Sequence, residues 1–93
     1  MIDEILLTLL RRSPMTAGEI ARQLEADAGA VSKQCGAMMG RGLLFVDGDK
    51  RIERNLHPRW ALTSAGEHVA RETKASRAAA ARLGTVKPEE VEE

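Results

Sequence analysis

Residues 15–33 of this chain read MTAGEIARQLEADAGAVSK, a stretch that contains the start signals of two short helices and the turn between them. Thr16 and Glu19 have the spacing of a capping box, in which the threonine hydroxyl accepts from the Glu19 amide and the glutamate carboxylate accepts from the Thr16 amide. A helix should therefore begin directly after Thr16 and end near Leu24. Asp27 is a favourable N-cap for a further helix. The stretch predicts two helices in series with a tight turn between them.

The flanking residues extend this helical pattern. Residues 2–12 carry apolar side chains at i, i+3, i+4, i+7 and i+8, which predicts an amphipathic helix that ends before Pro14. The helix capped by Asp27 should cover about residues 28–40. Its buried face should carry Val31, Cys35, Met38 and Met39. Three helices are therefore expected to enclose one aliphatic core.

A β-hairpin should follow the third helix. Residues 43–46 (LLFV) form a strand-like apolar run, and Asp47-Gly48 directly after it is a strong hairpin-turn signal. Residues 59–62 (RWAL) read as the returning strand, in which Trp60 packs against the body. The segment 47–59, from the turn signal to the start of the returning strand, is polar and partly basic. We call this segment the wing.

A last helix should begin after the hairpin. Residues 64–67 (SAGE) repeat the capping-box spacing, with Thr63 as a competing cap, which predicts a helix over about residues 65–82. Gly84 and Pro88 should end it, and the glutamate-rich close should be disordered. The expected organisation is a folded domain over 1–72, an extension of the last helix over 73–84, and a disordered acidic tail over 85–93.

Composition limits the class of protein. A chain of 93 residues can enclose one core. Cys35 is its only cysteine, which excludes an internal disulfide and a cysteine-based zinc site and favours a reducing, cytoplasmic setting. The N-terminus lacks the basic start of a signal peptide, and no apolar run approaches the ~20 residues needed to cross a bilayer. We expect a cytoplasmic protein with no membrane segment.

Charge is unevenly distributed along the chain. The chain has 14 basic and 14 acidic residues, but four glutamates lie within the last six positions. Residues 1–87 therefore carry a charge of about +4, so the folded part is mildly basic. A mildly basic surface is compatible with a nucleic-acid partner.

Motifs for catalysis are missing from the sequence. It contains no glycine-rich phosphate loop, no nucleophile elbow and no metal-ligand spacing, and its two histidines, His57 and His68, have no cysteine partner nearby. We expect neither enzymatic activity nor a cofactor or metal. Cys35 lies on a predicted buried face, so we interpret it as a core residue.

Four short segments, in order, resemble the MarR-type and related bacterial or phage winged-helix regulators over about residues 2–72. Residues 15–24 are similar to the family's second helix, and residues 31–33 (VSK) to the "VSR" of its recognition helix. Residues 41–44 (RGLL) match the "KGLV" that leads into the wing, and residues 62–66 (LTSAG) match the "LTxxG" that leaves it. The resemblance implies a mainly α winged helix-turn-helix with a small β-hairpin: a three-helix core, a wing and a C-terminal helix.

The resemblance also implies a transcription regulator that binds double-stranded DNA. The third helix, about 28–40, would enter the major groove and the wing would lie on the backbone. A homodimer through the first and last helices is expected, because such proteins commonly read paired half-sites. The implied DNA-binding residues are Ala28, Gly29, Ser32 and Lys33 on the helix and Lys50, Arg51, Arg54 and Arg59 in the wing.

The composition of the third helix leaves a second function open. Its exposed positions carry no arginine or asparagine, the side chains that discriminate bases by bidentate contacts. Gly29, Gly36 and Gly40 cost the helix about 1 kcal/mol each relative to alanine. Either the helix backbone approaches DNA closely, or the Gly/Ala face of this helix binds another protein. The alternative function is thus a winged-helix protein–protein interaction module of a phage-type or accessory protein.

Overall fold

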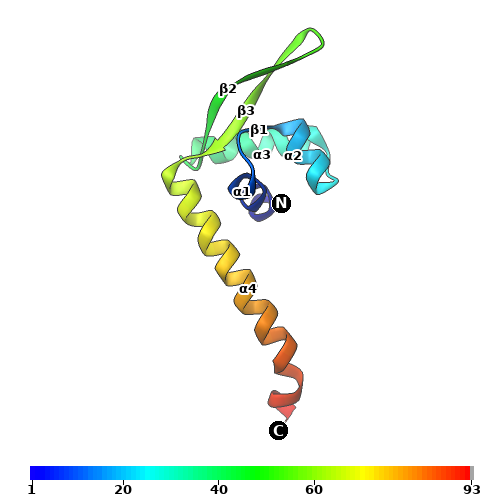
Figure 1. Cartoon of the computed structure of the whole chain (residues 1–93), viewed down its shortest axis with the longest axis vertical. Helices are drawn as coiled ribbons and strands as arrows, with labels where there is room; N and C mark the ends of the chain where they lie inside the picture. Colours follow the sequence, from blue (N-terminus) through cyan, green and yellow to red (C-terminus); the bar gives the residue numbers. More distant parts are fainter. Residues whose placement is uncertain (93) are drawn as a thin grey trace.

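Three short helices, a small antiparallel sheet and one long helix follow one another in the computed structural model (Figure 1), which describes the backbone of residues 1–92 and the side chains of residues 1–81. The sequence order therefore confirms a mainly α winged helix-turn-helix with a hairpin wing. The elements are α1 (Ile2–Arg11), β1 (Met15–Thr16), α2 (Ala17–Leu24), α3 (Ala28–Gly40), β2 (Leu44–Ile52), β3 (Asn55–Leu62) and α4 (Ser64–Glu92). No helix in the described part of the chain is long and apolar enough to cross a membrane.

Aliphatic side chains from every helix meet in one core. Trp60 is the only ring in it, only 5% exposed, and it packs the sheet against the helices as the sequence predicted. Cys35 is fully buried beside its neighbours on α3. The largest fully buried apolar side chains of this core are Ile5, Leu6, Leu9, Ile20, Val31, Cys35, Met38 and Leu44, and Ala70 adds a buried contact from α4.

The two predicted helix caps form as expected. The Glu19 amide donates to Thr16 Oγ1 at 3.1 Å, and the Thr16 amide donates to Glu19 Oε1 at 2.9 Å, which completes the capping box of α2. Asp27 caps α3 by accepting from the Ala30 amide at 2.9 Å. Between the two helices Glu25 adopts the left-handed conformation, with φ of 55°. These local hydrogen bonds fix the residues at which α2 and α3 begin.

The sheet contains a strand that the sequence did not indicate. Its order is β1-β3-β2, all antiparallel, with Met15 opposite Trp60 and Thr16 opposite Arg59. A two-residue strand leaves no alternation pattern in the sequence, and its pairing depends on a partner more than 40 positions away. This strand attaches the base of the hairpin to the start of α2.

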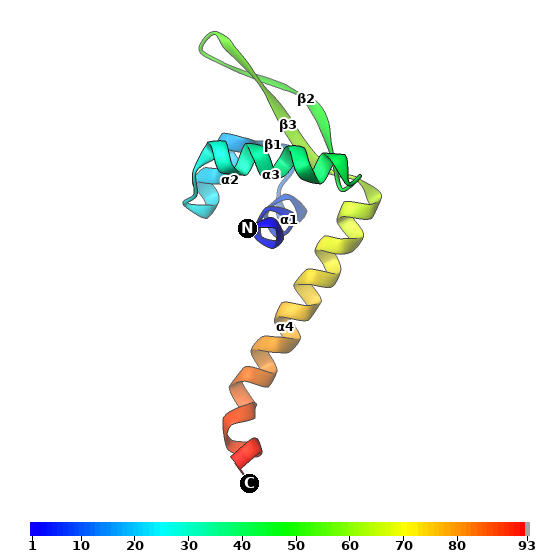
Figure 2. The same ribbon diagram turned by 180° about the vertical axis from the view of Figure 1, so that it is seen from behind.

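The predicted hairpin turn at Asp47-Gly48 is wrong. The pairing of β2 with β3 continues past it to Ile52 opposite Asn55, so the turn lies at residues 53 and 54. The register shifts between Val46 and Asp49, and Gly48 has φ of +80°. A glycine at positive φ serves a β-bulge as well as a turn, and local sequence does not separate the two. The hairpin is longer than predicted and projects from the body (Figures 1 and 2).

The start and the end of α4 also differ from the sequence-based expectation. Thr63, not Ser64, is the cap: the Gly66 amide donates to Thr63 Oγ1 at 3.0 Å. The described backbone continues α4 past Gly84 and Pro88 to Glu92, whereas the sequence predicted that these two residues end the helix. The disorder of the acidic tail stays a prediction. Residue 93 and the side chains beyond residue 81 lie outside the described part.

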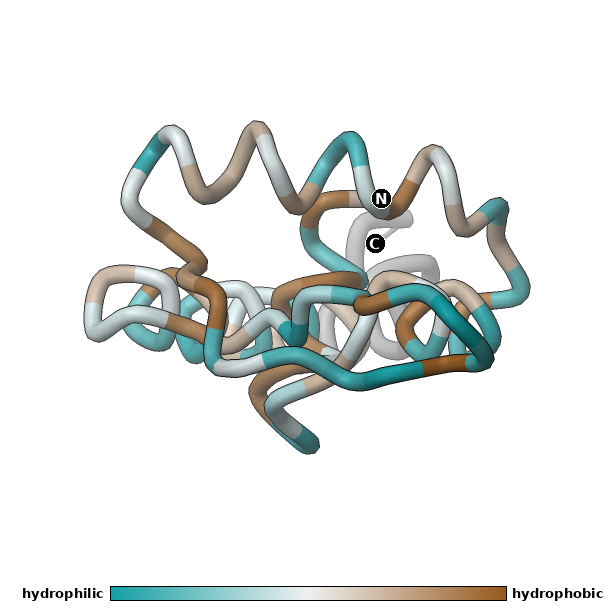
Figure 3. The backbone as a smooth tube through the Cα atoms, turned by 90° about the horizontal axis from the view of Figure 1, so that it is seen from above, coloured by the Kyte–Doolittle hydropathy of each residue, from teal (hydrophilic) through white to brown (hydrophobic). Residues whose placement is uncertain are grey.

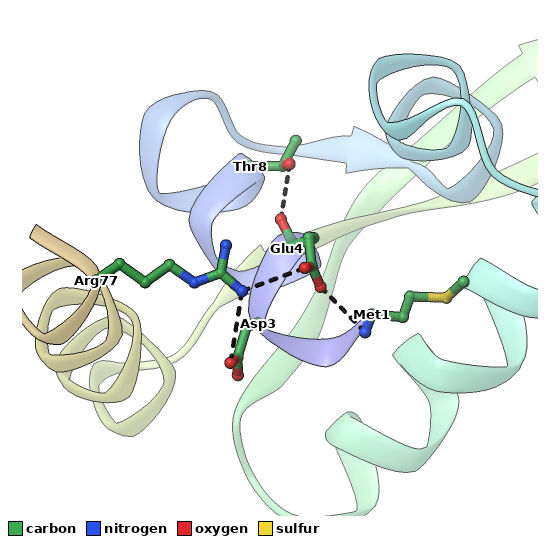
Figure 4. A network of polar contacts seen from close by, with 5 residues as sticks. All are labelled: Met1, Asp3, Glu4, Thr8 and Arg77. Atoms are coloured by element: carbon green, nitrogen blue, oxygen red, sulfur yellow. Dashed lines mark hydrogen bonds and ion pairs between the residues drawn. The ribbon is translucent and has the colours of Figure 1, made fainter. Parts of the chain in front are cut away.

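A polar network attaches the middle of α4 to the start of α1 (Figure 4). Arg77 Nη2 lies 3.2 Å from Glu4 Oε2 and 3.6 Å from Asp3 Oδ2. The amino group of Met1 lies 3.0 Å from Glu4 Oε1. Hydrogen bonds from the Met1 amine, the Glu4 backbone and Arg77 lower the pKa of Glu4 from 4.5 to about 2. The ionised carboxylate therefore holds the two helices together.

Replacing Glu4 with glutamine should make stability less dependent on acid pH. Since the pKa of Glu4 is lower in the folded chain, its contribution is complete above about 4.5 and is lost as the pH falls towards 2. The Glu4 side chain is 43% exposed, so we expect less than about 1 kcal/mol at pH 6. Urea unfolding at pH 6 and pH 3 measures the free energy of unfolding of wild type and of the variant. The same difference between the two proteins at both pH values would contradict the prediction.

Candidate nucleic-acid interface

The exposed side of α3 forms one edge of the molecule. Figure 3 looks down on the hairpin side, where α3 runs along one margin and the hairpin lies in front of the remaining body. The four predicted groove residues all have exposed side chains or backbone there. They are Ala28, Gly29, Ser32 and Lys33. This edge therefore offers small residues and one positive charge to a partner.

Two of the three glycines of α3, Gly36 and Gly40, have no packing role within the described part of the chain, whereas Gly29 leaves room for the Asp27 cap. A Cβ built on Gly36 or on Gly40 would meet no atom within 4 Å, and one built on Gly29 would meet the carboxylate of Asp27 at 3.0 Å. Met39, predicted to be core, is 47% exposed, because it lies at the edge of the buried face that Val31, Cys35 and Met38 occupy. The stability that Gly36 and Gly40 cost is not recovered by contacts inside the protein.

The cationic residues of the wing divide into two kinds. Arg51 and Arg54 are exposed near the hairpin tip and make no ion pair with any described residue. Lys50 Nζ instead lies 2.6 Å from Glu19 Oε2, which ties the wing to α2. The hydrogen bond from Lys50, followed by that from the Thr16 amide, lowers the pKa of Glu19. The structure therefore gives Lys50 an internal partner that the sequence did not suggest.

Arg59 is half-buried and lies against the β-bulge. Its guanidinium group lies 3.0 Å from the place where a Cβ on Gly48 would stand, and its Nε is buried without a hydrogen-bond partner in the described part. Glycine is favoured at position 48 for its positive φ, while a Cβ there would displace only the flexible end of Arg59. Arg59 is therefore less accessible than Arg51 and Arg54.

Acidic side chains reduce the positive charge of the wing. Asp47, Asp49 and Glu53 are all exposed on the same hairpin as the four basic residues. The wing carries a net charge of about +1 before Lys50 is paired with Glu19. Attraction of a polyanion by the hairpin therefore depends on individual contacts of Arg51 and Arg54 more than on its overall charge.

Two further arginines come together beside the base of the wing. A hollow of about 530 Å³ is lined by Arg12, Pro14, Met15, Glu19, Arg22 and Gln23. Arg12 follows the end of α1, and Arg22 lies in the last turn of α2. Neither arginine was predicted from the sequence as a site residue, because no local motif joins a residue at the end of one helix to a residue on another.

The remaining features of the described part are a buried thiol and a second hollow. Burial raises the pKa of the Cys35 thiol to about 11, which keeps it protonated and unreactive in the core. No group of three metal-ligating side chains comes together among the described residues. A second hollow, of about 300 Å³, lies beside α1 and is mainly apolar, with Leu7, Leu10 and Leu24 in its lining.

Comparisons with known proteins identify the fold. No protein-family model and no curated protein matches the sequence. Among solved structures, a variant of Lactococcus lactis ZitR is 24% identical with a TM-score of 0.69, covering 90% of this chain and 58% of that one. MarR of Staphylococcus aureus, in complex with salicylate and kanamycin, is 17% identical with a TM-score of 0.76, covering 92% of this chain and 56% of that one.

A third similar structure is a complex with DNA. MepR of S. aureus, solved bound to DNA, is 16% identical with a TM-score of 0.70, and the match covers 98% of this chain and 73% of that one. The present chain thus spans between about half and three quarters of the length of these proteins. Its fold is the winged helix of the MarR-like regulators.

Proposed function

We propose that this chain binds double-stranded DNA as a transcription regulator, with α3 in the major groove and the wing on the phosphate backbone. The observation that carries the proposal is the exposed edge of α3, where Gly36 and Gly40 face open space, beside a projecting hairpin with two accessible arginines. A groove about 12 Å wide accepts one helix. Gly29, Gly36 and Gly40 allow the helix backbone to approach the bases closely.

The charges on this surface suit phosphate contacts. Lys33 on α3 and Arg51 and Arg54 on the wing are exposed and unpaired among the described residues. Contacts of this kind position a protein on a duplex without reading its sequence. With no arginine or asparagine on the edge of α3, specificity would come mainly from groove shape and from backbone approach.

We further propose a cytoplasmic homodimer. The fold of MarR-like regulators supports pairing through α1 and α4, and two copies would place two α3 helices on successive half-sites. The ion-paired contact of Arg77 with Glu4 fixes the direction of α4 relative to α1, which such an arrangement requires.

Binding to a random duplex should be strongly salt-dependent. Each neutralised phosphate contributes a slope of about −0.9 to log affinity against log salt, so Lys33, Arg51 and Arg54 alone should contribute about −2.7 per protomer, and any further phosphate contact adds to this. Fluorescence-anisotropy titration of the full chain at low and physiological salt measures this slope. A protein that does not bind a duplex even at low salt would overturn the proposal.

A protein-interaction module is the second candidate. The observations that favour it are the three acidic side chains on the wing and the exposed Met39 beside the small residues of α3. A partner helix can pack closely against a face of glycine and alanine. Absence of duplex binding at low salt would favour this candidate over the first.

A further inference from the structure

The hollow beside the base of the wing brings two arginines from different elements to one place. Arg12 is the residue that ends α1, and Arg22 lies in the last turn of α2. Both side chains are exposed, and both line the same hollow of about 530 Å³ together with Gln23. Three groups rich in N–H donors therefore surround one accessible space.

The only carboxylate in that lining already has partners. Glu19 Oε2 lies 2.6 Å from Lys50 Nζ, and Glu19 Oε1 accepts from the Thr16 amide at 2.9 Å. Neither Arg12 nor Arg22 makes an ion pair with any residue that the structure describes. The two guanidinium charges are thus left uncompensated, and an anion is the ligand that this hollow favours.

The hollow lies next to the surface already assigned to DNA. The Lys50–Glu19 ion pair joins the base of the wing to the first turn of α2, and Arg22 lies one turn further along the same face of α2 as Glu19. In helix-turn-helix proteins the helix before the recognition helix crosses the DNA backbone. Arg22 therefore lies on the helix expected to cross a phosphate strand when α3 is in the groove.

We propose that Arg12 and Arg22 form a two-residue clamp for a phosphate group of the DNA backbone, assisted by the side-chain amide of Gln23. The inference rests on the DNA-binding function proposed above and adds a contact outside α3 and the wing. Arginine suits this role because its planar fork of donors matches the oxygens of a phosphate. The paired Glu19 does not repel the phosphate as a free carboxylate would, which makes Lys50 a supporting residue.

The double variant R12A/R22A tests the clamp. If two phosphate contacts are lost, the slope of log affinity against log salt should become less negative by about 1.8, which corresponds to about 60-fold weaker binding at 0.1 M salt. The conservative variant R12K/R22K keeps both charges and should keep most of the slope. Thermal unfolding of all variants checks that the fold is intact.

The matched control is R71A/K74A, which removes the same charge from the exposed surface of α4. It should leave the slope nearly unchanged, because both residues lie on α4, which extends away from α3 and the wing (Figure 1). Size-exclusion chromatography checks that this variant keeps the oligomeric state of the wild type. Equal slopes for R12A/R22A and for wild type, in a wild-type protein that binds the duplex, would overturn the clamp alone. A wild-type protein that binds no duplex would overturn the DNA function together with it.

Free phosphate has the same chemistry as a backbone phosphate. Titration of the protein with inorganic phosphate, followed by its melting temperature, separates the two sources. The clamp predicts little stabilisation by millimolar phosphate and a changed DNA slope in R12A/R22A. Stabilisation of wild type but not of the variant, with an unchanged DNA slope, would assign the hollow to the free ion and overturn the proposal.

Discussion

Replacing Gly66 with alanine is expected to lower the free energy of unfolding by about 3 kcal/mol or more. A Cβ at this position would lie against the carbonyl oxygen of Leu43 and 2.9 Å from its carbonyl carbon. That carbonyl is held in place, since it accepts from the Thr63 amide at 3.0 Å. Overpacking against fixed backbone costs more than overpacking against a mobile side chain. Thermal unfolding should show a melting temperature lower by at least about 12 °C.

Gly36 supplies the matched control for this substitution. A Cβ there would meet no atom within 4 Å, and alanine in a helix interior is favoured over glycine by about 1 kcal/mol. Gly36→Ala should therefore raise the melting temperature while Gly66→Ala lowers it. Similar melting temperatures for the two variants would contradict the prediction. They would mean that the start of α4 can move away from the Leu43 carbonyl at little cost.

Removing the two accessible arginines of the wing should weaken DNA binding by about 60-fold at 0.1 M salt. Arg51 and Arg54 have no ion pair in the described part of the chain, so the loss is not offset by rearrangement of an internal contact. Two phosphate contacts account for a change of about 1.8 in the salt slope, and the effect should be similar for every duplex sequence. Anisotropy titration of R51A/R54A with two unrelated duplexes measures both quantities.

The α4 variant R71A/K74A again controls for a general change in charge. Unchanged affinity in R51A/R54A would remove the wing from the interface, and a loss for one duplex sequence only would indicate base readout by the wing instead of phosphate contact. Either result would leave the clamp of Arg12 and Arg22 to be judged by its own salt slope.

Local chemistry made much of the fold predictable from the sequence. The starts of α2 and α3 follow from Thr16 and Asp27, whose side chains bind amides only three positions away. The amphipathic spacing of α1 likewise predicts which of its side chains are buried, because one helix face is set by residues within two turns. Helix caps and helix faces can therefore be predicted from a short stretch of sequence, because all the residues that determine them lie within it.

Features that depend on distant partners were not predictable in this way. Gly48 has the conformation that a turn would need, but strand pairing beyond it makes it a bulge. The ion pair of Lys50 with Glu19, 31 positions away, was likewise not predicted, and phosphate contact by Lys50 stays a prediction. Thr63 caps α4 in place of Ser64, and its hydroxyl also donates to the carbonyl of Gly42 just after α3. The spacing of residues around 63 and 64 does not predict that distant contact. The candidate site is affected most, because its residues come from four separate elements.

The junction at Thr63 has a mechanical consequence. Its hydroxyl donates to the carbonyl of Gly42 at 2.6 Å and accepts from the Gly66 amide at 3.0 Å, so one side chain joins the end of the α3 segment to the first turn of α4. Gly42 precedes β2 and Thr63 follows β3, so this one hydroxyl also closes the two ends of the hairpin on each other. Losing it would free the start of α4 and the base of the wing at the same time.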